Sequence, residues 1–241
     1  MEELEYETGL RALLLRGARD RPGVLVLHGG AGIGEHERAW ASDLTRQGYT
    51  TMLPDVFGVP FRDRAHGIEI ITGLVSSPDL LRSRLNAALH ALVQVGASDA
   101  RRSGAVGFCF GGLAALELAR SGADLRAVVA IHGGLQTQAP ARRSEVRARI
   151  LVCIGGRDPH VPREHRVAWE DEMTAAEIDW HLDVHGTALH GYTERTTGRP
   201  GCAYDAAAAA ATRATTFSFL ETSFASIEPP RQFAEVCDLA P

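Results

Sequence analysis

Residues 107–111, with the sequence GFCFG, constrain the fold of this 241-residue chain more than any other segment. They connect an apolar run at 105–108, which predicts a buried strand, to a run at 113–120, which predicts a helix. A strand that turns directly into a helix needs small residues around the turn, because Cβ atoms would clash there. The glycines of this segment and Gly112 meet that need. The pattern predicts a sharp turn that presents Cys109 at the carboxyl end of a strand.

The side chain of Cys109 has two interpretations. The pattern G-x-C-x-G has the form of a nucleophile elbow, with cysteine in place of the usual serine. Amides at the start of the following helix would favour a thiolate and could stabilise a developing oxyanion. Alternatively, Cys109 packs as a small apolar residue, as most free cysteines do. The choice depends on the residues that accompany Cys109 elsewhere in the chain.

Composition excludes several classes of protein. Hydrophobic residues make up 45% and charged residues 23%, as is usual for a globular domain. The formal net charge of −5 argues against nucleic acid or an anionic membrane as a partner. No apolar run has membrane-spanning length, and the acidic N-terminus does not resemble a signal peptide. The four cysteines are scattered without a C-x-x-C pair, so we expect no metal site and reduced thiols in the cytoplasm.

Short β-branched runs alternate with longer amphipathic stretches along the chain. This pattern predicts an α/β fold with a mostly parallel central sheet flanked by helices. With no repeat or linker, we expect a single domain over 1–241, as a monomer or homodimer. Residues 57–78 are expected to form a loop or short lid, and about 228–241 an extended C-terminal tail. Strands are expected at 11–15, 24–28, 50–53, 104–108, 127–131, 150–154 and 178–184, and helices at 37–47, 80–95, 113–120, 164–175 and 206–220, the last capped by Asp205.

A cysteine nucleophile needs a base, and the base needs a group that orients it. Asp158 follows the strong strand at 150–154 in a glycine-rich loop, and His190 follows the strand at 178–184. Nucleophile, acid and histidine thus occur in the order of an α/β hydrolase, each in a loop after a strand. Taken alone, Asp158 could be a turn residue and any histidine a surface or core residue. Three other histidines compete with His190, namely His160, His181 and His185.

An oxyanion hole would require two backbone amides. One is expected from Phe110, the residue after the nucleophile, and the other from Gly30 or Ala31 in the glycine-rich run after the strand at 24–28. The alternative for this run is an ordinary turn. A dinucleotide-binding loop is rejected, because the glycine spacing at 30–34 does not fit G-x-G-x-x-G.

These motifs together resemble the dienelactone hydrolase family of α/β-hydrolases. The resemblance covers about residues 10–224 and implies the α/β-hydrolase fold, a Cys109–His190–Asp158 triad, a covalent acyl-enzyme and hydrolysis of esters or lactones without a cofactor. The motifs that carry it are GFCFGG at 107–112, DPHVP at 158–162, HGYT at 190–193, QGY at 47–49 with PDVFG at 54–58, and YDAA at 204–207.

Two departures from the family bear on activity and substrate. The family carries a glutamate that interacts with the resting cysteine, and the aligned position here is about Gly29, so activation of the cysteine must differ. The family binds a substrate carboxylate with an arginine four residues after the histidine, where this chain has Glu194. A small neutral ester is therefore the expected partner, because a carboxylate near Glu194 would be repelled.

Aromatic residues near the expected loops are candidate substrate contacts. They are Tyr192, Phe57, Phe61 and Trp40, together with Glu194. The alternative for each aromatic side chain is packing in the core, which is the more common role of such residues. A neutral phosphotriester is an alternative substrate for the same cysteine, because its attack also develops negative charge on one oxygen. A third alternative is a redox-sensing or binding protein without hydrolytic activity, because a fold does not by itself imply catalysis.

Overall fold

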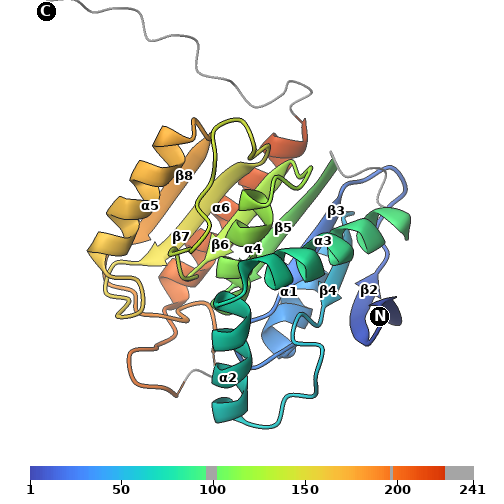
Figure 1. Ribbon diagram of the computed structural model, residues 1–241, viewed down its shortest axis with the longest axis horizontal. Coiled ribbons are helices and arrows are strands. Elements are labelled where there is room, and N and C mark those ends of the chain that lie inside the picture. Colours follow the sequence, from blue (N-terminus) through green and yellow to red (C-terminus); the bar gives the residue numbers. More distant parts are fainter. Residues whose placement is uncertain (96–101, 196–197, 226–241) are drawn as a thin grey trace, which may run out of the picture.

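The computed structural model describes residues 1–95, 102–195 and 198–225, which form one sheet with helices on both faces (Figure 1). The described strands pair in the order β1-β2-β4-β3-β5-β6-β7-β8. Their bounds are β1 Glu2–Glu7, β2 Leu10–Leu15, β3 Gly23–Leu27, β4 Thr50–Pro54, β5 Ser103–Phe108, β6 Ala127–Ile131, β7 Arg149–Gly155 and β8 Trp180–His185.

The sheet is parallel from β4 to β8, and only β1 and β2 pair antiparallel with their neighbours. Every residue of β3, β5 and β6 is buried, because helices cover both faces of these central strands. The predicted α/β fold with a mostly parallel sheet is confirmed.

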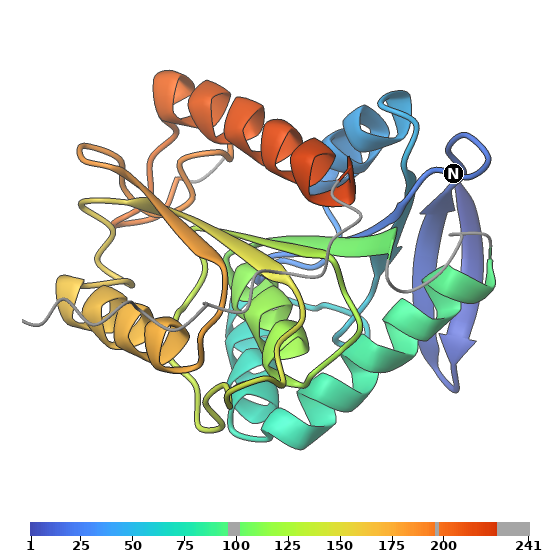
Figure 2. The same cartoon turned by 90° about the horizontal axis from the view of Figure 1, so that it is seen from above.

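Two helical layers enclose the sheet. The helices are α1 Glu35–Arg46, α2 Arg64–Val75, α3 Pro78–Gln94, α4 Phe110–Arg120, α5 Arg163–Ala175 and α6 Ala206–Ala225. Figure 2 shows α1 and α6 on one face and the other helices on the opposite face. A separate apolar cluster fills each side, one around Trp40 and Leu220 and the other around Leu81 and Trp169. The sheet therefore carries a core on each face.

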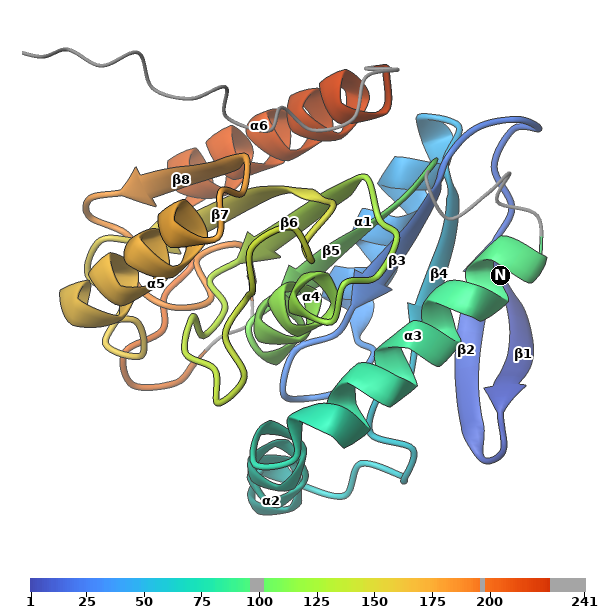
Figure 3. The same cartoon turned by 45° about the horizontal axis from the view of Figure 1, so that its top comes forward.

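The segment 57–78 corrects the sequence-based expectation. Instead of lacking regular structure, it contains α2, which Asp63 caps by accepting a hydrogen bond from the His66 amide at 2.9 Å. The glycines of the segment argued against a helix. Gly67 lies inside the helix because a Cβ there would lie 2.8 Å from the Gly30 carbonyl oxygen, which is too close for any other residue. Figure 3 shows α2 beside the start of α3, at one edge of the molecule.

Both ends of the described chain add to the expected elements. The sequence prediction missed β1, whose glutamates alternate with the half-buried Leu4 and Tyr6 at the edge of the sheet. The predicted cap of the last helix is confirmed, because Asp205 accepts hydrogen bonds from the amides of Ala207 and Ala208, each at 3.0 Å. The predicted tail at 228–241 lies outside the described residues. Within the described part of the chain, no helix is long and apolar enough to cross a membrane.

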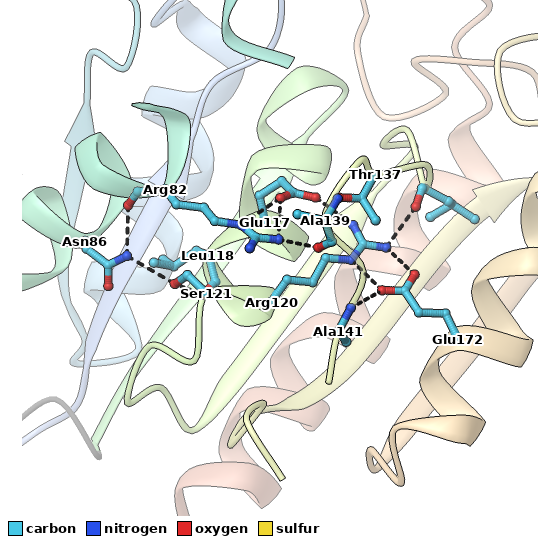
Figure 4. A network of polar contacts seen from close by, with 11 residues as sticks. Arg82, Asn86, Glu117, Leu118, Arg120, Ser121, Thr137, Ala139, Ala141 and Glu172 are labelled. Carbon is cyan, nitrogen blue, oxygen red and sulfur yellow. Dashed lines mark hydrogen bonds and ion pairs between the residues drawn. The ribbon is translucent and has the colours of Figure 1, made fainter. Parts of the chain in front are cut away.

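A buried ionic network joins α3, α4 and α5 (Figure 4). The Arg120 guanidinium, fully buried, binds both oxygens of Glu172 at 2.9 and 2.7 Å and one oxygen of Glu117 at 3.0 Å. Arg82 binds the other oxygen of Glu117 at 2.8 Å. Arg120 also donates to the carbonyl of Leu135 at 2.9 Å. The network therefore fixes the loop after β6 against three helices.

Candidate active site

The turn between β5 and α4 has the strained geometry of an elbow. Cys109 has φ 54° and ψ −115°, a backbone conformation that residues with a side chain rarely adopt. A Cβ on Gly107 would lie 1.9 Å from the Gly111 carbonyl oxygen, and one on Gly111 would lie 2.2 Å from that of Leu27. Only glycine fits at these two positions. The tight turn leaves the Cys109 side chain partly exposed at the carboxyl end of the sheet.

The structure brings the three side chains expected for the triad together. The Nε2 atom of His190 lies 3.2 Å from the Cys109 Sγ atom, and its Nδ1 atom lies 2.8 Å from an oxygen of Asp158. The other oxygen of Asp158 accepts a hydrogen bond from the His160 amide at 2.8 Å. Asp158 is thereby held on both oxygens and orients the imidazole toward the sulfur.

The charge state of His190 follows from these contacts. Burial by itself lowers its pKa, but the hydrogen bonds with Asp158 and Cys109 outweigh burial and raise the pKa to about 10. Of the competing histidines, His160 stacks edge-on against His190 at 4.8 Å, while His181 and His185 lie on β8. His190 is therefore the histidine that contacts both the thiol and the carboxylate.

A second loop anchors the backbone of His190, which sequence reasoning missed. The amide of His190 donates to the Gly201 carbonyl at 3.2 Å, and the amide of Ala203 donates to the His190 carbonyl at 3.2 Å. The sequence around His190 and Gly191 has no pattern that predicts this pairing with the later loop. The position of the imidazole thus depends on backbone contacts some ten residues further along the chain.

Two hydrogen bonds fix the Gly29 carbonyl in the loop after β3. The Gly29 carbonyl accepts from the His28 Nδ1 atom at 2.8 Å and from the Gly32 amide at 3.2 Å. In a trans peptide the N–H points away from the C=O, so the Gly30 N–H points away from these donors. Among the hydrogen bonds of the described residues, none uses the amides of Gly30, Ala31 or Phe110. These amides remain available to a ligand.

Glu37 is a site residue that sequence reasoning missed. Gly29 carries no carboxylate, yet the Glu37 Oε1 atom lies 3.7 Å from where a Gly29 Cβ would be, and the Cys109 Cβ lies 3.6 Å from the same point. Glu37 accepts hydrogen bonds from the amides of Gly29 and Gly34, at 3.2 and 2.9 Å. The only sequence signal is a glutamate at the third position of α1, where side chains often bind back to the helix start. A carboxylate therefore lies in the neighbourhood of the cysteine after all.

Two further histidines form a polar bridge behind His190. The Thr193 hydroxyl lies 2.8 Å from the Nε2 atom of His132 and 3.3 Å from that of His36. Burial lowers the pKa of both imidazoles, and the charge of His190 lowers that of His132 further. Since one hydroxyl has one proton, at least one imidazole donates to it. The bridge connects the start of α1 with the loops after β6 and β8.

The predicted substrate contacts fall into two groups. Tyr192, Trp40 and Phe57 are at most 5% exposed and pack in the core. The Tyr192 hydroxyl also bonds to the Thr212 hydroxyl at 2.8 Å, so its polar group points inward. This placement does not support contact between these three side chains and a substrate. Phe61 is 40% exposed beside α2 and stays a candidate.

Glu194 lies near the site but has a partner. Its carboxylate lies 3.4 Å from the Arg199 guanidinium, while Arg195 stacks over the Tyr204 ring. Burial raises the pKa of Glu194, Arg199 opposes this, and Glu37 adds to the rise. The negative charge expected at this position is therefore partly compensated. In the part of the chain that the structure describes, no group of three His, Cys, Asp or Glu side chains is arranged to hold a metal ion.

Comparison with known proteins identifies a family and a similar solved structure. The family model of the dienelactone hydrolase family matches residues 10–224. A solved dienelactone hydrolase-like promiscuous phosphotriesterase from metagenomic libraries superposes with a TM-score of 0.84 at 32% identity, over 92% of this chain and 97% of that one. The overlap shows the α/β-hydrolase fold.

Two sequence relatives extend the comparison. An uncharacterised protein of Caenorhabditis elegans is 36% identical over 60% of this chain and 95% of its own length. A probable 2-oxo-3-(5-oxofuran-2-ylidene)propanoate lactonase of Bradyrhizobium sp is 28% identical over 72% of this chain and 74% of its own length.

Proposed function

Because the chain belongs to the dienelactone hydrolase family, we propose that it hydrolyses neutral carboxylic esters or lactones with Cys109 as the nucleophile. The observation that carries the proposal is the contact of Cys109 Sγ with His190 Nε2 at 3.2 Å, with Asp158 on the other ring nitrogen at 2.8 Å. An elbow, a base and an orienting carboxylate are the parts that acyl transfer requires. The probable lactonase activity of the Bradyrhizobium relative supports a carboxylic ester as the substrate.

Acylation uses the contacts already in place. His190 holds the proton of the thiol, because its raised pKa favours the imidazolium, and the Cys109 sulfur attacks the carbonyl carbon. The carbonyl oxygen becomes an oxyanion, which the amides of Phe110 and Gly30 stabilise. The C–O bond to the leaving group then breaks, and His190 Nε2 gives its proton to the departing alkoxide. A thioester of Cys109 and a neutral His190 result.

Deacylation reverses the roles. Neutral His190 takes a proton from water, and the resulting hydroxide attacks the thioester carbon in the same oxyanion hole. The C–S bond breaks, the carboxylic acid leaves, and the Cys109 thiolate again faces the His190 imidazolium. Asp158 keeps the imidazole oriented in both halves. The cycle consumes one water and uses no cofactor.

Charge near the site favours neutral substrates. The carboxylates of Glu37 and Glu194 are close enough for Glu37 to raise the pKa of Glu194. A substrate carboxylate would add a third negative charge in a partly buried space, which costs more than in water. Arg199 is already paired with Glu194 and offers an anion little compensation. A neutral ester avoids this cost.

A neutral phosphotriester is the second candidate substrate. The observation that favours it is the 32% identity and TM-score of 0.84 to a promiscuous phosphotriesterase. Attack of the Cys109 sulfur on phosphorus places negative charge on the phosphoryl oxygen, where the same two amides would bind it. The leaving group departs by the same proton transfer from His190.

Hydrolysis of p-nitrophenyl acetate and paraoxon tests both proposals. Wild type is compared with Cys109→Ala and Cys109→Ser, and intact-protein mass spectrometry after rapid quench detects an acetyl or diethylphosphoryl adduct. We expect loss of activity in Cys109→Ala by about 1,000-fold or more and an adduct only where Cys109 is present. Cys202→Ala is the matched control, because Cys202 is also partly exposed and pairs with His190 through the backbone, whereas the sulfur that lies at His190 Nε2 is that of Cys109.

Full activity of Cys109→Ala on both substrates would exclude the proposed mechanism. Turnover of paraoxon with no phosphoryl adduct on Cys109 would exclude the second candidate alone. Adducts on wild type with no turnover would favour a binding or sensing protein.

A further inference from the structure

Glu37 is a buried carboxylate that accepts its hydrogen bonds from the backbone. It is 5% exposed, and its hydrogen bonds go to the backbone amides of Gly29 and Gly34. Among the described residues no arginine or histidine forms an ion pair with it. Burying a carboxylate is costly unless neighbouring groups compensate it, so this arrangement requires a reason.

The two amides that Glu37 occupies lie on either side of the expected oxyanion donors. Gly29 precedes Gly30 and Ala31, and Gly34 follows them at the start of α1. Glu37 therefore binds both ends of the loop, with one carboxylate oxygen on each amide. His28 holds the carbonyl of the same Gly29 at 2.8 Å. Gly29 is thus fixed at its N–H by Glu37 and at its C=O by His28.

Fixing Gly29 at both ends determines the direction of the next amide. The peptide between Gly29 and Gly30 is planar and trans, so a held carbonyl leaves the Gly30 N–H pointing the opposite way. A glycine-rich loop without such contacts would sample many backbone conformations and lose this direction. Preorganised donors stabilise an oxyanion because they need no reorientation during the reaction.

We propose that Glu37 is a positioning residue that holds the Gly30 amide in the oxyanion hole, an inference that rests on the proposed hydrolytic function. In this role Glu37 needs no contact with the substrate and no proton transfer. It acts through the backbone of Gly29 and Gly34, and both of its oxygens accept. A glutamine cannot replace it, because the side-chain NH₂ group would face a backbone N–H.

The test separates the oxyanion hole from the nucleophile. Glu37→Gln and Glu37→Asp are compared with wild type on p-nitrophenyl acetate, and Cys109 is alkylated in parallel with iodoacetamide, a reaction that forms no oxyanion. We expect kcat to fall about 10- to 100-fold in Glu37→Gln, with KM and the alkylation rate within about 3-fold of wild type. Glu37→Asp keeps the charge but is too short to reach both amides, so its kcat should also fall.

Glu35→Gln is the matched control, because Glu35 lies two residues earlier in the same helical turn and is exposed. It removes the same charge from the start of α1 and should leave kcat unchanged. Thermal unfolding of each variant gives the folded fraction by which kcat is corrected.

Three results would overturn the inference. One is a corrected kcat of Glu37→Gln and Glu37→Asp equal to that of wild type, which would reduce Glu37 to a folding role. Another is a parallel fall in kcat and alkylation rate, which would place the effect on Cys109 and His190. The third is full activity of Cys109→Ala, which removes the proposed function first and is thereby distinguishable from failure of the role of Glu37 alone.

Discussion

Two buried polar clusters of this protein compensate their charges in opposite ways. In the network of α3, α4 and α5, carboxylates face guanidinium groups, and Arg120 binds both oxygens of Glu172 (Figure 4). At the carboxyl end of the sheet, Asp158 faces an imidazole, and Glu37 accepts hydrogen bonds from two backbone amides. The first cluster pairs carboxylates with guanidinium groups, whereas the second places an imidazole between a thiol and a carboxylate.

The difference separates stability from reactivity. A carboxylate that binds arginine in a bidentate manner is stabilised in its ionised form, because arginine does not lose its proton. The elbow adds backbone strain at Cys109, which costs of order 1–3 kcal/mol, and such strain is typical of functional sites. We therefore expect substitutions in the network to change stability and substitutions in the site to change activity.

The largest effect that would sharpen this comparison is expected for Asp158→Asn. Asparagine can still accept the His160 amide but would donate to the Nδ1 atom of His190 and select the wrong tautomer. We expect kcat/KM to fall about 1,000- to 10,000-fold with little change in the urea midpoint. Asp205→Asn is the control, because asparagine also caps a helix. A large loss of stability with activity intact would contradict the comparison.

Arg120→Met is expected to show the opposite pattern. It leaves Glu172 without its cation and Glu117 with Arg82 alone, which should cost about 3–5 kcal/mol of unfolding free energy. Activity per folded molecule should stay near wild type, because the network does not contact the triad. Arg142→Met removes a cation from an exposed pair and should leave the urea midpoint unchanged. A change of less than about 1 kcal/mol in Arg120→Met would contradict the assigned role.

A smaller effect is expected from the polar bridge behind His190. Burial and the charge of His190 lower the pKa of His132 well below 6.5, so below pH 6.5 the unfolded chain binds a proton that the folded protein does not. Stability is therefore present above pH 6.5 and decreases as the pH falls toward the folded pKa. His132→Asn should flatten this decrease by up to about 1.4 kcal/mol per pH unit.

Urea unfolding of wild type and His132→Asn at pH 7, 6 and 5 measures this slope. Some slope should remain in the variant, because burial also lowers the pKa of His36. Parallel stability curves for the two proteins would show that His132 does not titrate as expected.

The smallest effect concerns substrate charge. Glu194→Gln removes a carboxylate and leaves Arg199 uncompensated, so the ratio of kcat/KM for an anionic ester to that for a neutral ester should rise roughly 3- to 10-fold. The pair p-nitrophenyl hydrogen succinate and p-nitrophenyl butyrate measures the ratio, which should decrease again in salt. Glu164→Gln on the exposed surface of α5 is the control. An unchanged ratio would mean that Glu194 does not set the charge preference.

Much of the fold and the candidate triad could be predicted from local sequence. The central strands are continuous apolar runs, and the order Cys109, Asp158, His190 repeats the order of strand ends in a parallel sheet. The elbow could be predicted because its close backbone contacts allow only glycine at positions 107 and 111. These features depend on neighbours in the sequence or on strand order.

Other features depended on contacts between distant segments. The helix α2 was missed because Gly67 looks like a helix breaker until the Gly30 carbonyl lies against it. Tyr192 was expected to contact substrate, but its hydroxyl finds Thr212, twenty residues away on α6. Side-chain direction in a loop is set by such packing and has no signature in a single sequence.

The sequence by itself determined the parallel sheet, the elbow and the order of the three candidate triad residues, because strand periodicity and glycine at a tight turn are local requirements. Only the tertiary structure decided that the carboxylate of Glu37 lies beside Gly29, and that Arg120 is enclosed between Glu117 and Glu172. Burial decided both, because it brings polar groups from separate elements into one space where each must find a partner.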